Sequence, residues 1–308
     1  MKFIYAASVL LATCSAHPTK RITQAPSMLN ITDADILQYA LTLEHLEDKF
    51  YREGLANFTL EDFKKSGFNE VLYKNLKEVS YDETTHVSFL TQALTAANAT
   101  PVAECTYAFG VTDVHSFLAT ASILEGVGVS AYLGAAASVM EKLYLTAAGS
   151  ILTVEARHSA YLRKANKQSP SPQAFDTPLT LDQVYTLAAP FIVSCPESNG
   201  MLPVKAFPML SVTPEADCIA TNKTIVLQTK EPVAVEYNEK FYAAWISVTG
   251  PTFVEAKLES GNKFSTEVPV GFHGQSYVVI TKKEGSVTDD DVIAGPAALE
   301  VLGANGEK

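Results

Sequence analysis

Apolar residues recur at steps of three and four positions along four long stretches of the chain, the spacing that places them on one face of an α-helix. The first stretch begins at Thr32, and Asp35, three residues later, completes a capping pair. The long helices that these stretches predict cover 32–54, 70–96, 113–139 and 142–166. Because each apolar stripe has to be buried against another element, the pattern predicts a four-helix bundle.

The pattern changes after the fourth helix. A polar loop leads to a short helix at 181–191, and the segment that follows contains too much proline for a helix, so we expect an extended wrap along the bundle. Beyond residue 224, short β-rich runs alternate with turn residues: TIVLQT, VAVEY, YAAWISVTG, FVEAKL, KFSTEV and SYVVIT. The predicted fold class is therefore α+β, with a four-helix bundle over 30–212 followed by a smaller antiparallel β domain, a sheet or sandwich, over 224–308.

Two Glu-x-x-His pairs interrupt the apolar stripes. Glu83 and His86 lie on the stripe of the second long helix, and Glu155 and His158 lie on that of the fourth. A spacing of three residues places both side chains of a pair on one helix face. Burying four ionisable groups is costly unless they are paired or bind a metal. The simpler alternative is that these glutamates and histidines hydrogen-bond each other within the core.

An internal repeat supplies two more glutamates. Glu44 is followed seven residues later by Tyr51, and Glu125 by Tyr132, and each of these glutamates comes directly after a leucine. Seven residues make about two helical turns, so each tyrosine shares the face of its glutamate. The resulting order, Glu, Glu-x-x-His, Glu, Glu-x-x-His, is that of a two-metal centre inside a four-helix bundle.

Another glutamate on the first helix, Glu47, lies near the same apolar face, and periodicity alone does not choose between it and Glu44. The repeat favours Glu44, because Glu44 aligns with Glu125, whereas Glu47 aligns with Gly128, which has no side chain to offer. We therefore predict that Glu44 is the metal ligand.

These residues resemble the ferritin-like superfamily, which includes bacterioferritins, rubrerythrins and manganese catalases. The stretch LQYALTLEHLEDKFYREGL is most similar to the plant desiccation-related proteins and the secreted fungal stress-response proteins of that superfamily. The resemblance covers roughly residues 30–212 and implies two Fe or Mn ions, with Glu83 and Glu155 as bridges. It implies that one ion is held by Glu44, Glu83 and His86, and the other by Glu125, Glu155 and His158. Tyr51 occupies the position at which bacterioferritins keep a tyrosine near the metals, and we take Tyr51 and Tyr132 as candidate catalytic residues.

Two ions about 3.5–4 Å apart can bind O2 or peroxide between them while the carboxylates absorb the change in charge. The resemblance thus implies oxidative or stress-related metal chemistry, whether ferroxidase, peroxide-consuming or oxidase-like, with O2, peroxide or a small molecule as substrate. The chain would then be a dinuclear-metal oxidoreductase. The alternative is a non-enzymatic, glycosylated extracellular structural or surface-protective protein that keeps a vestigial metal site.

The N-terminus and the composition indicate a secreted protein. Residues 1–16 combine an early lysine, a short apolar run and small residues before a cleavage position, as in a signal peptide. No later stretch reaches the roughly 20 apolar residues that a membrane span needs. The net charge of −11 lacks the basic field that nucleic-acid binding requires. Four Asn-x-Thr sequons support an extracellular or cell-wall location: Asn30, Asn57, Asn98 and Asn222.

The remaining landmarks concern the cysteines and the β domain. Removal of the signal peptide leaves three cysteines, so one thiol is left over. Cys195 and Cys218 flank one proline-rich segment, and we predict a disulfide between them, with a bond from Cys105 to either partner as the alternative. In the β domain, we expect Trp245 in the core and His273 in a loop, and contact with carbohydrate or a cell wall stays open.

Overall fold

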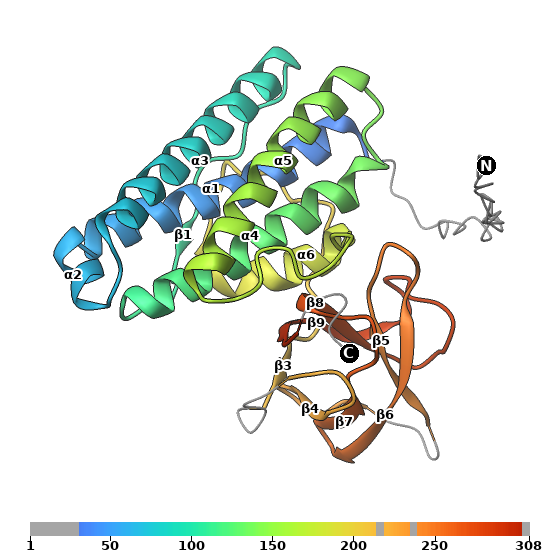
Figure 1. The fold of residues 1–308 in the computed structure, drawn as a ribbon. Coiled ribbons are helices and arrows are strands. Elements are labelled where there is room, and N and C mark those ends of the chain that lie inside the picture. The colour runs from blue at the N-terminus through green and yellow to red at the C-terminus, as the bar shows by residue number, and fades with distance from the viewer. Residues whose placement is uncertain (1–30, 214–218, 235–238, 304–308) are drawn as a thin grey trace, which may run out of the picture.

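The computed structural model describes residues 31–213, 219–234 and 239–303, in which a helical bundle is followed by a β domain (Figure 1). The long helices of the bundle are α1 (Asp33–Asn57), α3 (Glu70–Ala96), α4 (Val114–Ala136) and α5 (Lys142–Ala165). The shorter helices are α2 (Leu60–Lys65), α6 (Leu181–Ala188) and the 3-10 helix η1 (Ala189–Phe191). This arrangement confirms the predicted α+β class.

Side-chain caps set where α1 and α5 begin. Thr32 accepts a hydrogen bond from the Asp35 amide, and the Asp35 carboxylate accepts one from the Thr32 amide, as the sequence predicts. Asp33, in the first turn of α1, accepts hydrogen bonds from the amides of Met140 and Glu141, each at 2.8 Å. This contact holds the α4–α5 turn against the start of α1, so the three helices meet at one end of the bundle.

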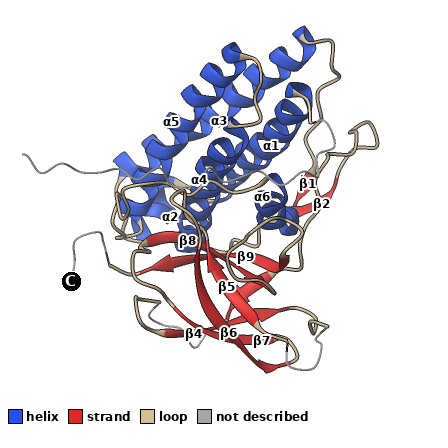
Figure 2. Ribbon diagram, turned by 90° about the vertical axis from the view of Figure 1, so that its right-hand side faces the viewer, coloured by secondary structure: helices blue, strands red, loops and turns tan. Residues whose placement is uncertain are grey.

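Seven strands form one antiparallel sheet in the described part of the β domain (Figure 2). They are β3 (Leu210–Val212), β4 (Thr224–Thr229), β5 (Phe241–Trp245), β6 (Thr252–Ser260), β7 (Lys263–Glu267), β8 (Gly274–Thr281) and β9 (Val292–Val301). Their order across the sheet is β3-β4-β7-β6-β5-β8-β9, and the two outermost strands also contact each other, so the sheet curls around a core. The side chain of Trp245 is fully buried in this core.

The β domain differs from the prediction near both of its ends. β3 lies in the proline-rich segment that we expected to wrap along the bundle, and it pairs with β4 instead. β9 contains Gly295-Pro296, a pair typical of turns, yet the strand continues across it with a shift of register opposite β8. The first two residues of the expected strand VAVEY lie outside any strand, and its other residues lie outside the described part of the chain.

The β domain is attached to the bundle through α4 and α5. The Tyr277 hydroxyl of β8 donates to the Gly126 carbonyl of α4 at 2.9 Å, and Arg163 of α5 donates two hydrogen bonds to Glu300 of β9, at 2.9 and 2.8 Å. A Cβ on Gly126 would lie 2.4 Å from the end of the Gln275 side chain, which would have to move aside to make room for it. Among the described helices, only α4 is long and apolar enough to cross a membrane, and 61% of its apolar window is buried, as in a core helix.

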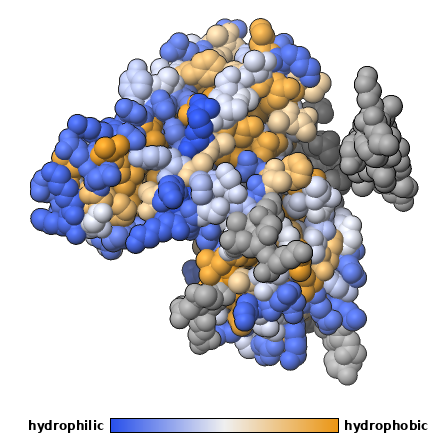
Figure 3. All heavy atoms as spheres, in the orientation of Figure 1, coloured by the Kyte–Doolittle hydropathy of each residue, from blue (hydrophilic) through white to orange (hydrophobic). Residues whose placement is uncertain are grey.

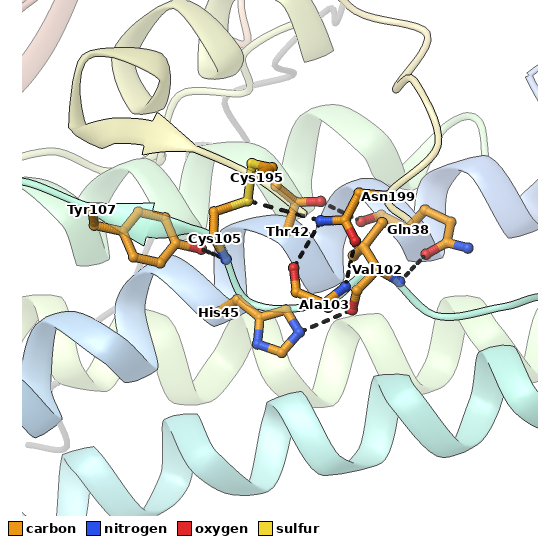
Figure 4. The surroundings of a disulfide bond; sticks show 9 residues. All are labelled: Gln38, Thr42, His45, Val102, Ala103, Cys105, Tyr107, Cys195 and Asn199. Carbon is orange, nitrogen blue, oxygen red and sulfur yellow. Dashed lines mark hydrogen bonds between the residues drawn. A yellow bond between two sulfur atoms is a disulfide. The ribbon is translucent and has the colours of Figure 1, made fainter. Parts of the chain in front are cut away.

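A disulfide joins Cys105 to Cys195, so the predicted bond between Cys195 and Cys218 is wrong (Figure 4). Cys105 lies in the α3–α4 loop directly before β1 (Thr106–Tyr107), and Cys195 directly follows β2 (Ile192–Ser194). The two short strands pair with each other, which brings the cysteines together. Sequence alone could not show this, because the pairing joins segments 90 residues apart. Cys218 lies outside the described residues.

Candidate metal centre

The six predicted metal ligands converge inside the bundle, with α1 and α4 each supplying one glutamate and α3 and α5 each supplying a Glu-x-x-His pair. The four glutamates are at most 1% exposed and the two histidines at most 8%. Within the described part of the chain, their ligand atoms form two groups, each with all atoms within 4.8 Å of one another. The first group is Glu44, Glu83, His86 and Glu155, and the second is Glu83, Glu125, Glu155 and His158. Each group could hold a metal ion, and Glu83 and Glu155 belong to both.

Both histidines turn the same ring nitrogen, Nδ1, toward the carboxylates. His86 Nδ1 lies 3.3 Å from an oxygen of each of three glutamates: Glu44, Glu83 and Glu155. His158 Nδ1 lies 3.0 Å from Glu83 and 3.3 Å from Glu125. Each imidazole therefore faces the glutamate that the family resemblance assigns to the same ion, together with the shared Glu83.

Most of the atoms that face the centre have no hydrogen-bond partner among the described residues. There are six such buried atoms: Glu44 Oε2, Glu83 Oε1, Glu125 Oε2, both carboxylate oxygens of Glu155, and His158 Nδ1. A buried polar atom without a partner costs free energy, about 1–3 kcal/mol and more when it is charged. Each ligand group brings several carboxylate oxygens and one imidazole nitrogen close together, which is what a metal cation requires. The residues present therefore fit two metal ions.

Tyr51 and Tyr132 cross between the two halves of the repeat. The Tyr51 hydroxyl donates to Glu125, and the Tyr132 hydroxyl donates to Glu44. Each tyrosine thus contacts the glutamate of the other half and not the one on its own helix. Burial, followed by the charge of the contacted glutamate, raises the pKa of both phenols well above the ordinary value. Both tyrosines therefore remain protonated and act as hydrogen-bond donors.

Comparison with known proteins agrees with this geometry. Residues 32–168, which contain all six predicted ligands, match the family model of the Ferritin-like domain. The helical bundle of this chain is a ferritin-like domain. The chain is also similar to Protein rds1 of the fission yeast Schizosaccharomyces pombe, with 26% identity over 330 aligned residues that cover 87% of this chain and 80% of the relative. The recognition made from the sequence is thus confirmed, while the role of each ligand stays a prediction.

Glu47 is buried beside the ferritin-like centre but belongs to neither ligand group. A Cβ on Gly128 would lie 3.1 Å from Glu47 Oε1 and 3.0 Å from Glu155 Oε2. The glycine that aligns with Glu47 in the repeat therefore leaves the space that the Glu47 carboxyl group occupies next to Glu155. Burial, followed by the charge of Glu155, raises the pKa of Glu47 well above its ordinary value. The sequence placed Glu47 near the apolar face but did not predict this complementarity.

Asp82 is a residue of the centre that the sequence analysis missed. Its Oδ2 lies 3.2 Å from Nε2 of His158, the ring nitrogen opposite the one that faces Glu83 and Glu125. A carboxylate behind a ligand histidine orients the ring and leaves the other nitrogen free to bind metal. Asp82 directly precedes Glu83, but Val154 holds the matching position before Glu155, so the repeat gives no signal there.

Asp82→Ala should lower metal affinity by about 10- to 100-fold, because His158 loses the group that orients its ring. The matched control is Val154→Ala, which alters the equivalent position of the repeat without removing a hydrogen bond. Competition titration of both variants with Mn(II) measures the affinities. An equal loss in the two variants would show that Asp82 acts only through helix packing.

The charges around the metal-free centre determine how it binds protons. Burial, followed by the charge of Glu125, raises the pKa of Glu83 to about 7. Burial lowers the pKa of His158, but the Glu125 and Glu83 carboxylates close to its Nδ1 outweigh that effect and raise the pKa to about 11. Neighbouring glutamates also raise the pKa of His86, so both imidazoles of the metal-free centre are protonated at neutral pH, and Glu83 takes up a proton at lower pH.

Metal uptake should release protons, and metal affinity should increase with pH. A bound ion requires a neutral imidazole and ionised carboxylates. Binding therefore has to displace the proton of His86 and that of His158, whose pKa is about 11, and also that of Glu83 below pH 7, the value near which its pKa lies. Calorimetric titration with Mn(II) in two buffers of different ionisation enthalpy counts the protons released. Equal affinity at about pH 6 and about pH 8, without proton release, would contradict this assignment.

Proposed function

We propose that this chain is a secreted dinuclear-metal oxidoreductase that binds two Fe or Mn ions and reacts with O2 or peroxide. The observation that carries the proposal is the set of six buried ligand atoms that make no hydrogen bond among the described residues and come from all four long helices. The oxygen-rich donor set, with one imidazole at each site, suits Fe or Mn. In this role, both sites would share Glu83 and Glu155, while Glu44 with His86 and Glu125 with His158 would complete the two ligand sets.

The protein residues prepare the centre for a change of charge. When bound, a pair of redox-active ions supplies the electrons that O2 or peroxide takes up. Tyr51 and Tyr132 position Glu125 and Glu44 by donating to one carboxylate oxygen of each, which leaves the second oxygen facing the centre. The near-complete burial of the glutamates excludes bulk water from their surroundings. These are the conditions under which the carboxylates can balance a change in metal charge.

A vestigial, purely structural centre is the competing interpretation. In that case the glutamates and histidines would satisfy one another by hydrogen bonds. Only the contact between His86 Nδ1 and Glu83 Oε2, at 3.3 Å, is a hydrogen bond within the two described ligand groups. The imidazoles approach the glutamates at 3.0–3.3 Å, yet six buried atoms of the centre make no hydrogen bond among the described residues, which favours the metal-binding interpretation.

Two features support secretion as part of the proposal. The disulfide between Cys105 and Cys195 is compatible with an oxidising, extracellular environment. The sequon asparagines within the described residues, Asn57, Asn98 and Asn222, are all exposed and could accept glycans without disturbing the core. Asn30 and the expected signal peptide at 1–16 lie outside the described residues.

Anaerobic loading with Fe(II), followed by mixing with O2 or hydrogen peroxide, tests the reaction. We expect the loaded protein to consume one of these oxidants much faster than the Glu83→Ala variant, because that variant loses the glutamate shared by both ligand groups. Oxygen-electrode and stopped-flow absorbance measurements give the rates. Rates equal to those of free Fe(II), in a protein that does bind two ions, would reject the oxidoreductase and leave the metal centre standing.

A further inference from the structure

A narrow apolar cavity extends from the metal centre along the inside of the bundle. All four long helices line it, and we call it the alanine slot because six of its lining residues are alanines: Ala40, Ala93, Ala131, Ala135, Ala147 and Ala148. Its inner end includes Glu44, Glu47, Gly128 and Tyr132. None of these features is required merely to hold two ions.

The lining residues run in one direction from the metal centre on every helix. On α1 they extend back from Glu47 to Ile36, a distance of about 16 Å at 1.5 Å per residue. On α4 they extend forward from Gly128 to Ala135, and Val139, which follows the helix, packs with Tyr144 of α5 at the rim. Within the slot, the centre of a water-sized sphere can occupy a volume of only about 50 Å³. If this volume extends over the roughly 16 Å of lining, the slot is about as wide as one alkyl chain.

The opposite half of the bundle is filled with large side chains. Phe50, Tyr51, Phe63, Phe117 and Leu118 pack there, and none is more than 1% exposed. The repeat places related ligands toward both ends of the bundle, so large side chains could have filled the slot end in the same way. The alanines on that side keep the space beside Glu44 open instead.

The outer end of the slot is apolar as well. Phe89 lines the slot and is 45% exposed. Met140 and Leu143, adjacent in sequence to the rim residues Val139 and Tyr144, are 76% and 78% exposed. Figure 3 shows apolar atoms reaching the surface over the helical part of the molecule. The one charged residue of the described lining away from the inner end is Asp33, and its carboxylate accepts the amides of Met140 and Glu141.

We propose that the alanine slot binds an unbranched alkyl chain, so that the substrate of the metal centre is lipid-derived. Length, width and polarity support this occupant: the slot is long, about one chain wide and apolar from the rim almost to Glu44. A diatomic gas would not require 16 Å of ordered apolar lining, roughly the length of three helical turns. The substrate role rests on the proposed oxidoreductase function, whereas binding of the chain does not.

Calorimetric titration of the purified full-length protein with 1-hexanol, 1-octanol and 1-decanol tests the binding. Burial of each added methylene contributes about 0.8 kcal/mol, so affinity should rise about fourfold per methylene until the slot is full. A branched or cyclic alcohol of equal carbon number should bind much more weakly, because the slot is one chain wide. No binding, or equal affinity for linear and branched isomers, would overturn the proposal.

A pair of variants on α5 locates the binding site. Ala148→Phe should fill the slot and weaken 1-decanol binding by at least about tenfold, whereas Ser150→Phe, on the exposed face of the same helix, should leave it unchanged. Circular dichroism checks that both variants fold, and the alcohol series on the unmodified protein stands without them. Undiminished binding in a folded Ala148→Phe variant would place the alkyl site elsewhere and reject the proposal.

Metal content separates this proposal from the proposed function. Two bound ions without any alcohol binding would reject the alkyl slot and leave the metal centre intact. Alcohol binding by a protein that takes up no metal would keep the slot and reject the oxidoreductase. Uptake of xenon under pressure, without uptake of alcohols, would show that the slot admits only small gases.

Discussion

Replacing Glu44 with alanine will lower the metal content of the protein, whereas replacing Glu47 with alanine will leave it nearly unchanged. Glu44 Oε2 is buried without a hydrogen-bond partner and lies 3.3 Å from His86 Nδ1, inside the first ligand group. Glu47 belongs to neither group among the described residues. Loss of an outer-shell partner costs about 10- to 100-fold in affinity, so loss of a ligand should cost more than about 100-fold at the site that contains His86.

Elemental analysis of both variants after identical reconstitution measures this difference. The two substitutions remove the same chemical group, one helical turn apart on α1, so they control for each other. Equal metal loss in both variants would show that the repeat, which pairs Glu44 with Glu125, is a poor guide to the ligands. Loss confined to Glu47→Ala would reverse the assignment.

Removing the disulfide with Cys105→Ala and Cys195→Ala together should lower the free energy of unfolding by about 4–5 kcal/mol. The bond closes a loop between residues 90 positions apart, and a loop of that length carries an entropy of closure of this size in the unfolded chain. The side chain of Asn199 also binds this region, through the amide and the carbonyl of Ala103 at 2.8 Å each (Figure 4). The native state therefore keeps its shape around the lost bond, and the destabilisation arises mainly in the unfolded state.

Denaturant unfolding of the double variant and of Cys218→Ala measures the effect and its location. Cys218→Ala should be nearly neutral, because the disulfide of the structure does not use that thiol. A loss below about 1 kcal/mol in the double variant would contradict the loop-entropy argument. A large loss in Cys218→Ala would favour the pairing of Cys195 with Cys218 that the sequence suggested.

The helices and the ligand cluster could be predicted because both follow local rules. The capping pair of Thr32 and Asp35 and the steps of three and four positions are visible within one or two helical turns. The cluster required one further assumption, that the two halves of a repeat fold alike, and it brings Glu44 and Glu125 to equivalent places. The same assumption gave no reason to select Asp82, because the equivalent residue in the other half of the repeat is Val154.

The features that escaped prediction depend on contacts between distant segments. The disulfide follows from the pairing of β1 with β2, two strands too short to leave a hydrophobic pattern. β9 is hidden by Gly295-Pro296, which signals a turn locally but lies within a strand that packs against β8. The alanine slot is visible only after four helices are assembled, since small residues in one helix are equally compatible with close packing.

Elemental analysis of the protein, purified without added metal or chelator, tests the central claim most directly. The Glu83→Ala variant, purified in parallel, measures metal bound adventitiously, because it lacks the glutamate common to both ligand groups. A centre of this kind holds two ions, so we expect about two Fe or Mn per chain in the unmodified protein and almost none in the variant. Absence of bound Fe and Mn from the unmodified protein, even after reconstitution with either metal, would contradict the account.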